Sequence, residues 1–277
     1  MQRRDFVRLA LLAPFASPLQ ALAKPATERP EAASPAADPV KDYLFRMREP
    51  DHHYPGDIRA DGKMLNLLNA IDARLERAED VIGYANFTVA SLDDILGFAR
   101  NFTQIGEFSR AETDLIERLF YEDASHYGFL GTKPLDSLTQ SIGRNEIVKI
   151  RGSGHYLYRG RPTSMYDEIR AALGSDVVLT SGVRGIVKQL RLFVAKATSF
   201  DGNLSLASRS LAPPGYSFHG IGDFDVGIAG WGARNFTADF AETEIFKRLI
   251  DLGYVAIRYP LDNRLGVRFE PWHIRVG

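Results

Sequence analysis

Residues 217–227 read Ser-Phe-His-Gly-Ile-Gly-Asp-Phe-Asp-Val-Gly, a glycine-rich turn that runs into a short apolar strand. His219 is followed four and six residues later by Asp223 and Asp225. Because glycine permits a tight backbone turn, such a segment can present an imidazole and a carboxylate oxygen to one metal ion. This spacing also arises often by chance, and on that basis a hydrogen-bonded core histidine is an equally good interpretation.

The strand in this segment is one of several short β-rich runs that occur after residue 145. The runs are Ile147–Ile150, Val177–Thr180, Phe224–Val226, Val255–Tyr259 and Val267–Phe269. Helical patterns alternate with them at Met165–Leu173, Ile186–Ala197 and Thr237–Leu252. The alternation is too irregular for a series of parallel βαβ units. We therefore expect residues 146–277 to form an α+β catalytic domain, with a small mixed or antiparallel sheet and flanking helices.

Residues 41–145 carry mostly helical patterns. One apolar face, with members spaced alternately by four and three residues, consists of Met64, Leu68, Ile71, Leu75, Ala78 and Ile82. Ser109 and Glu112 form the pattern of a capping box ahead of another apolar run. We expect a helical subdomain here, and the sequence gives no indication of its role.

The first forty residues have the composition of an export signal and a linker. Arg3-Arg4 precedes an uncharged stretch, Leu9–Ala23, that ends in small residues and is shorter than the roughly 20 residues needed to span a bilayer. This layout predicts a cleaved signal peptide over residues 1–23, of the twin-arginine type, and hence a periplasmic or cell-envelope protein without a membrane span in its mature form. Residues 24–40 are rich in Pro and Ala and are expected to form a flexible linker.

Composition narrows the choice of ligands and partners. The chain has 34 Lys and Arg residues against 35 Asp and Glu residues. It therefore lacks the excess of positive charge that is typical of nucleic-acid-binding proteins. It contains no cysteine, which excludes thiolate ligands. Any metal must therefore be held by histidine, aspartate or glutamate.

Two further groups of polar residues flank the 217–227 segment. Glu270-Pro-Trp-His273 lies near the C-terminus, and Ser181-Gly-Val-Arg184 is followed by Gln189. In an extended chain positions 270 and 273 face opposite sides, so both side chains reach one site only if the chain bends, and Pro271 favours such a bend.

Each residue also has a purely structural interpretation. Glu270 could belong to a surface ion pair, and Arg184 could cover apolar surface with its aliphatic stem. His155, in a Gly-Ser-Gly-His-Tyr run, is more typical of a hydrogen-bonded turn than of a ligand. The combination of His219, Asp225 and His273 with an unligated glutamate and an arginine nevertheless fits a catalytic zinc site, which keeps one coordination position open.

The three groups together resemble the family of zinc D-alanyl-D-alanine carboxypeptidases and dipeptidases, which is related to lysostaphin-type peptidases and the hedgehog amino-terminal domain. Its pattern S-x-H-x-x-G-x-A-x-D is matched by Ser217, His219, Gly222 and Asp225, with one residue fewer before the aspartate. Its E-x-W-H is matched by residues 270–273, and its S-G-x-R followed by Gln is matched by residues 181–189.

The resemblance implies one Zn²⁺ per chain, held by His219, Asp225 and His273. It implies that Glu270 is the general base and acid, that Arg184 binds the substrate carboxylate, and that Ser217 and Gln189 help to position substrate. Asp225 is preferred over Asp223 as the third ligand because Asp225-Val-Gly continues the family pattern; Asp223 is then expected to orient His219 through its other ring nitrogen.

The implied activity is hydrolysis of the terminal D-Ala-D-Ala bond of peptidoglycan stem peptides. Two alternatives stay open at this point. One is a peptidoglycan endopeptidase on the same fold, and the other is a non-catalytic zinc module that binds the cell wall or a protein partner.

Overall fold

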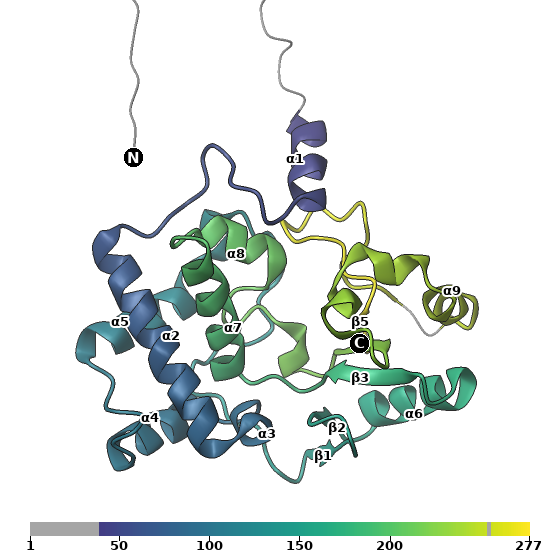
Figure 1. Ribbon diagram of the computed structural model, residues 1–277, viewed down its shortest axis with the longest axis horizontal. Helices are drawn as coiled ribbons and strands as arrows, with labels where there is room; N and C mark the ends of the chain where they lie inside the picture. Colours follow the sequence, from purple (N-terminus) through teal and green to yellow (C-terminus); the bar gives the residue numbers. More distant parts are fainter. Residues whose placement is uncertain (1–38, 254–255) are drawn as a thin grey trace, which may run out of the picture. The chain divides into compact units, whose positions relative to one another are not determined.

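The computed structural model describes residues 39–253 and 256–277, which cluster as one compact unit. Helices make up its first part, and strands are interleaved with helices after residue 146 (Figure 1). The α-helices are α1 (Pro39–Arg48), α2 (Gly62–Ile82), α3 (Tyr84–Phe87), α4 (Leu92–Asn101), α5 (Arg110–Tyr121), α6 (Arg161–Leu173), α7 (Ile186–Ser199), α8 (Leu204–Ser210) and α9 (Glu244–Asp251). The strands are β1 (Ile147–Lys149), β2 (Tyr156–Tyr158), β3 (Val177–Ser181), β4 (Phe224–Ile228) and β5 (His273–Ile274). The predicted α+β class is confirmed.

Local sequence signals explain the first helices. Helix α2 begins after Asp61, whose side chain accepts a hydrogen bond from the Met64 backbone N–H at 2.7 Å. Its buried residues lie on the predicted apolar face: Leu68, Ile71, Leu75 and Ala78. The capping box of Ser109 and Glu112 is present at the start of α5.

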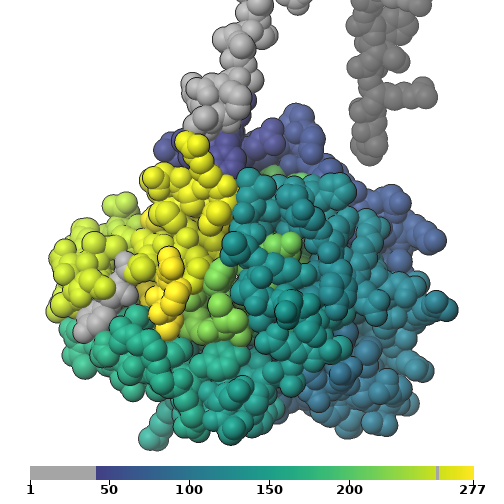
Figure 2. Space-filling view, turned by 180° about the vertical axis from the view of Figure 1, so that it is seen from behind, coloured from purple at the N-terminus to yellow at the C-terminus, as the bar shows by residue number. Residues whose placement is uncertain are grey.

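The helical region shares its core with the segment that follows it. Helix α7 packs against α2, and the largest apolar cluster combines side chains from both parts of the chain, such as Phe120 with Phe193 and Val194. Seen from behind, the C-terminal segment borders the helical region (Figure 2), and Leu130 donates a backbone hydrogen bond to Leu265 across this boundary. The boundary at residues 145 and 146 remains a prediction from sequence.

The sheet that positions the site has the order β3-β4-β5, and both pairs are antiparallel. Strand β4 is central, and Asp225 pairs with Ser181 on one side and with His273 on the other. Phe224 and Val226 point to the opposite face, into a second apolar cluster to which α6 and α9 also contribute. The alternation along β4 thus separates a polar site from an apolar core.

Residues 147–158 form an antiparallel hairpin of β1 and β2, with Ile147 opposite Tyr158. Strand β2 was not expected from the sequence, and neither was α8. Both are short, so their periodicity alone gives little signal.

Three predictions for the C-terminal part are wrong. Val267–Phe269 is not a strand, because Val267 accepts from the Asn263 side chain and Arg268 bonds to the Arg209 carbonyl instead of to a neighbouring strand. Of Val255–Tyr259, the described residues 256–259 form only an isolated bridge, at Ile257. The single helix Thr237–Leu252 is divided into a 3-10 turn (Ala238–Glu242) and α9, because Thr243 adopts an extended conformation and caps α9.

The predicted signal peptide, and the linker up to residue 38, lie outside the described residues. Within residues 39–253 and 256–277, no helix combines the length and apolar character needed to cross a membrane.

Candidate metal centre

The antiparallel register brings the key side chains together. Asp225 in the middle of β4 has Ser181 and His273 as its direct neighbours on the adjacent strands. Residues on opposite positions of paired strands are the closest side-chain neighbours in a sheet. Two of the three sequence groups therefore converge on the Asp225 position through backbone pairing alone.

His219 reaches the same place from a tight turn. It lies in a 3-10 turn (Phe218–Gly220), and Gly222 adopts a φ of 131° before β4 begins. Its Nδ1 lies 2.9 Å from the Gly182 carbonyl, which can only accept, so Nδ1 carries the proton and Nε2 presents a lone pair. Gly182 itself has no room for a side chain, because a Cβ there would lie 2.0 Å from the Tyr156 carbonyl oxygen.

The bend predicted in Glu270-Pro-Trp-His273 is confirmed. The His273 backbone N–H donates to the Glu270 carbonyl at 3.1 Å, which closes a four-residue turn with Pro271 at its second position. As a result, a Glu270 carboxylate oxygen lies 3.6 Å from His273 Nδ1. Trp272, between them, is buried in the apolar cluster under the sheet and also lines the cavity at the site.

His219, Asp225 and His273 form a group of buried donors that could hold a metal ion, with ligand atoms within 4.8 Å of one another. Asp225 Oδ1 lies 3.3 Å from His219 Nε2 and 3.3 Å from His273 Nδ1. This oxygen is buried and has no hydrogen-bond partner in the described part of the chain. A buried carboxylate oxygen without a partner is costly unless a cation binds it, so these residues fit a metal ion.

The charges of the donors agree with this assignment. Burial, together with the nearby Arg184, lowers the pKa of His219, so its imidazole is neutral as a ligand must be. Burial opposes ionisation of Asp225, but His219 and His273 hold the pKa of this carboxyl below its usual range. For His273, burial disfavours the charged form, yet the hydrogen bond to Asp223 and the nearby Asp225 carboxylate raise its pKa to about 9 without a metal. A bound metal would therefore displace a proton from this ring.

Asp223 is not one of the grouped ligands. Its carboxylate accepts from the Arg258 guanidinium, from the Val276 backbone N–H at 3.0 Å, and from His273 Nε2 at 3.0 Å. The expectation that it orients His219 is wrong, because the Gly182 carbonyl fills that role. Asp223 instead fixes the outer nitrogen of His273 and leaves Nδ1 facing Asp225.

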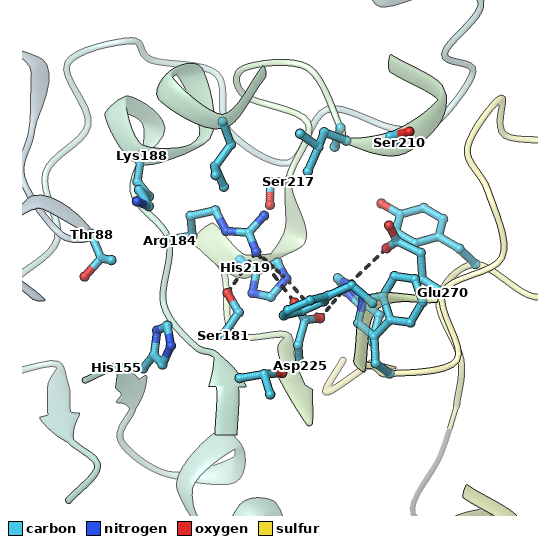
Figure 3. Close-up of a pocket in the computed structure, with 18 of the residues that line it drawn as sticks. Thr88, His155, Ser181, Arg184, Lys188, Ser210, Ser217, His219, Asp225 and Glu270 are labelled. Carbon is cyan, nitrogen blue, oxygen red and sulfur yellow. Dashed lines mark hydrogen bonds and ion pairs between the residues drawn. The ribbon is translucent and has the colours of Figure 1, made fainter. Parts of the chain in front are cut away.

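Arg184 lies beside the metal donors. Its guanidinium donates to the Ser181 hydroxyl at 2.8 Å and lies 3.4 Å from His219 Nε2 (Figure 3). It also donates to the Gln189 side-chain oxygen at 3.0 Å. Gln189 is buried, also bonds to the Ala212 carbonyl, and does not line the cavity. It therefore positions Arg184 and does not itself face a ligand.

The donors open into one cavity of about 330 Å³. Ser217, Arg184 and Glu270 line it, as the sequence patterns had indicated. Four lining residues that the sequence patterns did not point to as site residues are Tyr84, His155, Lys188 and Arg268. Of these, only Lys188 lies next to a predicted site residue in the sequence, one position before Gln189.

Two imidazoles, an ionised aspartate and a further buried glutamate beside an open cavity are the parts of a single-metal hydrolase. Residues 163–276, less than half of the chain, match the family model described as VanY, D-alanyl-D-alanine carboxypeptidase. This segment, which carries all the donors, is therefore similar to the VanY family of D-alanyl-D-alanine carboxypeptidases. No curated protein matches the chain in sequence.

Two solved structures are similar to the chain over 55% of its length, each at 21% identity. One is a mutant of the vancomycin resistance D,D-pentapeptidase VanY from a VanB-type resistance cassette in complex with Zn(II), matched over 88% of that chain with a TM-score of 0.41. The other is VanYB in complex with D-alanine-D-alanine, matched over 86% of that chain with a TM-score of 0.42. The family match, and not these superpositions, supports the assignment.

Proposed function

We propose that this carboxypeptidase domain uses one Zn²⁺ to remove the terminal D-alanine from peptidoglycan stem peptides that end in D-Ala-D-Ala. The observation that carries the proposal is the unpartnered, buried Asp225 oxygen between His219 and His273, inside a segment that matches the family. When bound there, zinc would lower the pKa of water to near 7 and polarise the scissile carbonyl.

Glu270 is the residue best placed to move the proton. Its carboxylate is buried at the cavity wall, and burial raises its pKa above the ordinary value of a glutamate. A base with a raised pKa accepts a proton from water and returns it to the leaving amine more effectively. Among the described residues, the nearest charged neighbours of this carboxylate are His273 at 3.6 Å and Arg268 at 3.9 Å.

Arg184 and Ser217 are proposed to hold the substrate. Two of the hydrogen-bonding groups of Arg184 are fixed by Ser181 and Gln189, which leaves other N–H groups of the planar fork for a carboxylate of the substrate. A requirement for this carboxylate favours exopeptidase over endopeptidase action.

A periplasmic or cell-envelope location is part of the proposal. It is supported by the Arg3-Arg4 motif and the apolar run that follows it, which form the pattern of a twin-arginine export signal.

The test is incubation of zinc-loaded protein with muropeptides that end in D-Ala-D-Ala, with products identified by mass. Loss of a single D-alanine is the expected result. Loss of the dipeptide, or cleavage of peptides without a free C-terminus, would contradict the exopeptidase assignment. An intact substrate with zinc bound would favour a non-catalytic binding module.

A further inference from the structure

One end of the cavity is not used by the function proposed above. Figure 3 shows His155, Lys188 and Thr88 on one side of Arg184, while Glu270 lies on the other side. Thr88 and the neighbouring Tyr84 come from the helical region, outside the segment that matches the family. This end of the cavity is therefore built partly by residues from outside the segment that matches the family.

Lys188 places a buried cation at this end. It lies in the first turn of α7, four residues after Arg184, and its side chain is only 9% exposed. Its ammonium group donates to Glu79 at 2.5 Å and lies 4.5 Å from the centre of the Tyr84 ring. Since an ammonium group has three N–H donors, the bond to Glu79 leaves donors for a ligand in the cavity.

His155 adds an unused polar group beside it. The residue is 7% exposed, its ring packs edge-on against Tyr84 at 5.4 Å, and its ring nitrogens have no hydrogen-bond partner within residues 39–253 and 256–277. Burial, followed by the effect of Arg184, lowers its pKa to about 4, so the imidazole is neutral and offers one N–H donor. Because His155 lines the cavity, this N–H group can donate to a ligand there.

We propose that Lys188 and His155, with Tyr84 as a wall, bind a carboxylate of the peptide substrate together with Arg184. The inference rests on the proposed function, since it names further residues of the same substrate site. Two cations and a neutral N–H donor on one face of a cavity match the acceptor oxygens of a carboxylate. The carboxylate is either the C-terminal one or a side-chain carboxylate within the stem peptide, and the two sources can be distinguished.

The experiment compares the protein with its Lys188→Met variant on four N-acetylated peptides. Two have a neutral residue before D-Ala-D-Ala and end in a free acid or an amide. The other two end in a free acid and carry glutamate or glutamine before D-Ala-D-Ala. We expect Lys188→Met to lower kcat/KM about ten- to hundredfold for the peptides that bear the recognised carboxylate, because a hydrogen bond to a charged group is lost. For their amide counterparts the decrease in kcat/KM should be much smaller.

Lys196→Met is the matched control, because Lys196 lies on the same helix, pairs with Asp51 and does not line the cavity. The double variant Glu79→Gln/Lys188→Met avoids leaving Glu79 without its partner and should show the same selective loss. A second readout is binding affinity, measured by calorimetry on the zinc-loaded, turnover-deficient Glu270→Gln protein with and without Lys188→Met. The ligands are D-Ala-D-Ala and its amide, or the glutamate and glutamine peptides.

The outcomes separate the two claims. A selective loss on the acid-ended peptides identifies the C-terminal carboxylate, and a selective loss on the glutamate peptide identifies a side-chain carboxylate. An equal loss on all peptides, or none, in both Lys188 variants overturns the inference while the activity of the wild type still stands. No cleavage by the wild type overturns the proposed function itself, and the calorimetric comparison then still tests the carboxylate site.

Discussion

The two aspartates of the 217–227 segment differ in how their oxygens are satisfied. Both Asp223 oxygens accept hydrogen bonds, from Arg258, Val276 and His273. Asp225 Oδ1, in contrast, is buried between two imidazoles without a partner in the described residues. Burial and sequence spacing alone do not distinguish the pair, because both are nearly inaccessible and lie two residues apart. The difference in hydrogen bonding favours Asp225 as the proposed metal ligand, whereas Asp223 fixes His273.

Asp225→Ala is expected to weaken zinc binding far more than Asp223→Ala. The first change removes one of three protein ligands, whereas loss of a residue that orients a ligand typically costs roughly 10–100-fold in affinity. Competition with a chelating dye measures both affinities. A larger loss for Asp223→Ala would reverse the assignment.

Glu270→Gln should retain zinc but lower kcat by about 10²–10⁴-fold, because the amide has a similar shape and cannot accept a proton from water. Metal content and turnover are measured on the same preparation. Near-normal turnover in the zinc-loaded variant would remove Glu270 from its role as the base.

Among the elements, the central strand β4 determines the site, since its register places Ser181, Asp225 and His273 in one row. Elements with strong local signals were predictable from the sequence, such as the apolar face of α2 and the capping box of α5. The conformation of the C-terminal segment was not predictable, because its backbone hydrogen bonds go to partners that are distant in sequence. Arg268, for example, bonds to the Arg209 carbonyl, and no periodicity reveals such a contact.

A buried ion pair connects the segment after α1 to α8. Arg209 donates to both oxygens of Asp57, at 2.7 and 3.0 Å. Burial alone would raise the pKa of Asp57, but the bonds from Arg209 and Asn203 lower it to about 2. Because the folded pKa lies below the unfolded value of about 3.9, the pair stabilises the fold above that value and loses its effect as the pH falls toward 2.

Asp57→Asn should therefore lower the melting temperature at pH 7, and the difference from the wild type should shrink between about pH 4 and pH 2. Thermal unfolding followed by circular dichroism over this range measures the difference. A constant difference at all pH values would show that the ionised form of Asp57 is not what stabilises this contact.

For the molecule as a whole, the site lies where residues 163–276, the segment that matches the family, meet the helical region. The metal donors, Glu270 and Arg184 were all predictable, because they belong to three short sequence patterns that the fold brings together. The roles of Tyr84 and His155 were not predictable, since these residues come from separate parts of the chain and reach the cavity only through tertiary packing. The helical region thus contributes both to the shared core and to one wall of the cavity.

The measurement that tests the central claim most directly is the release of D-alanine from a D-Ala-D-Ala peptide as zinc is titrated into metal-free protein. The account predicts no activity without metal and an activity that rises until one zinc per chain has been added. In His219→Ala and His273→Ala, this rise at one zinc per chain should be lost. Activity that is complete before any zinc is added, or that does not depend on these two histidines, would contradict it.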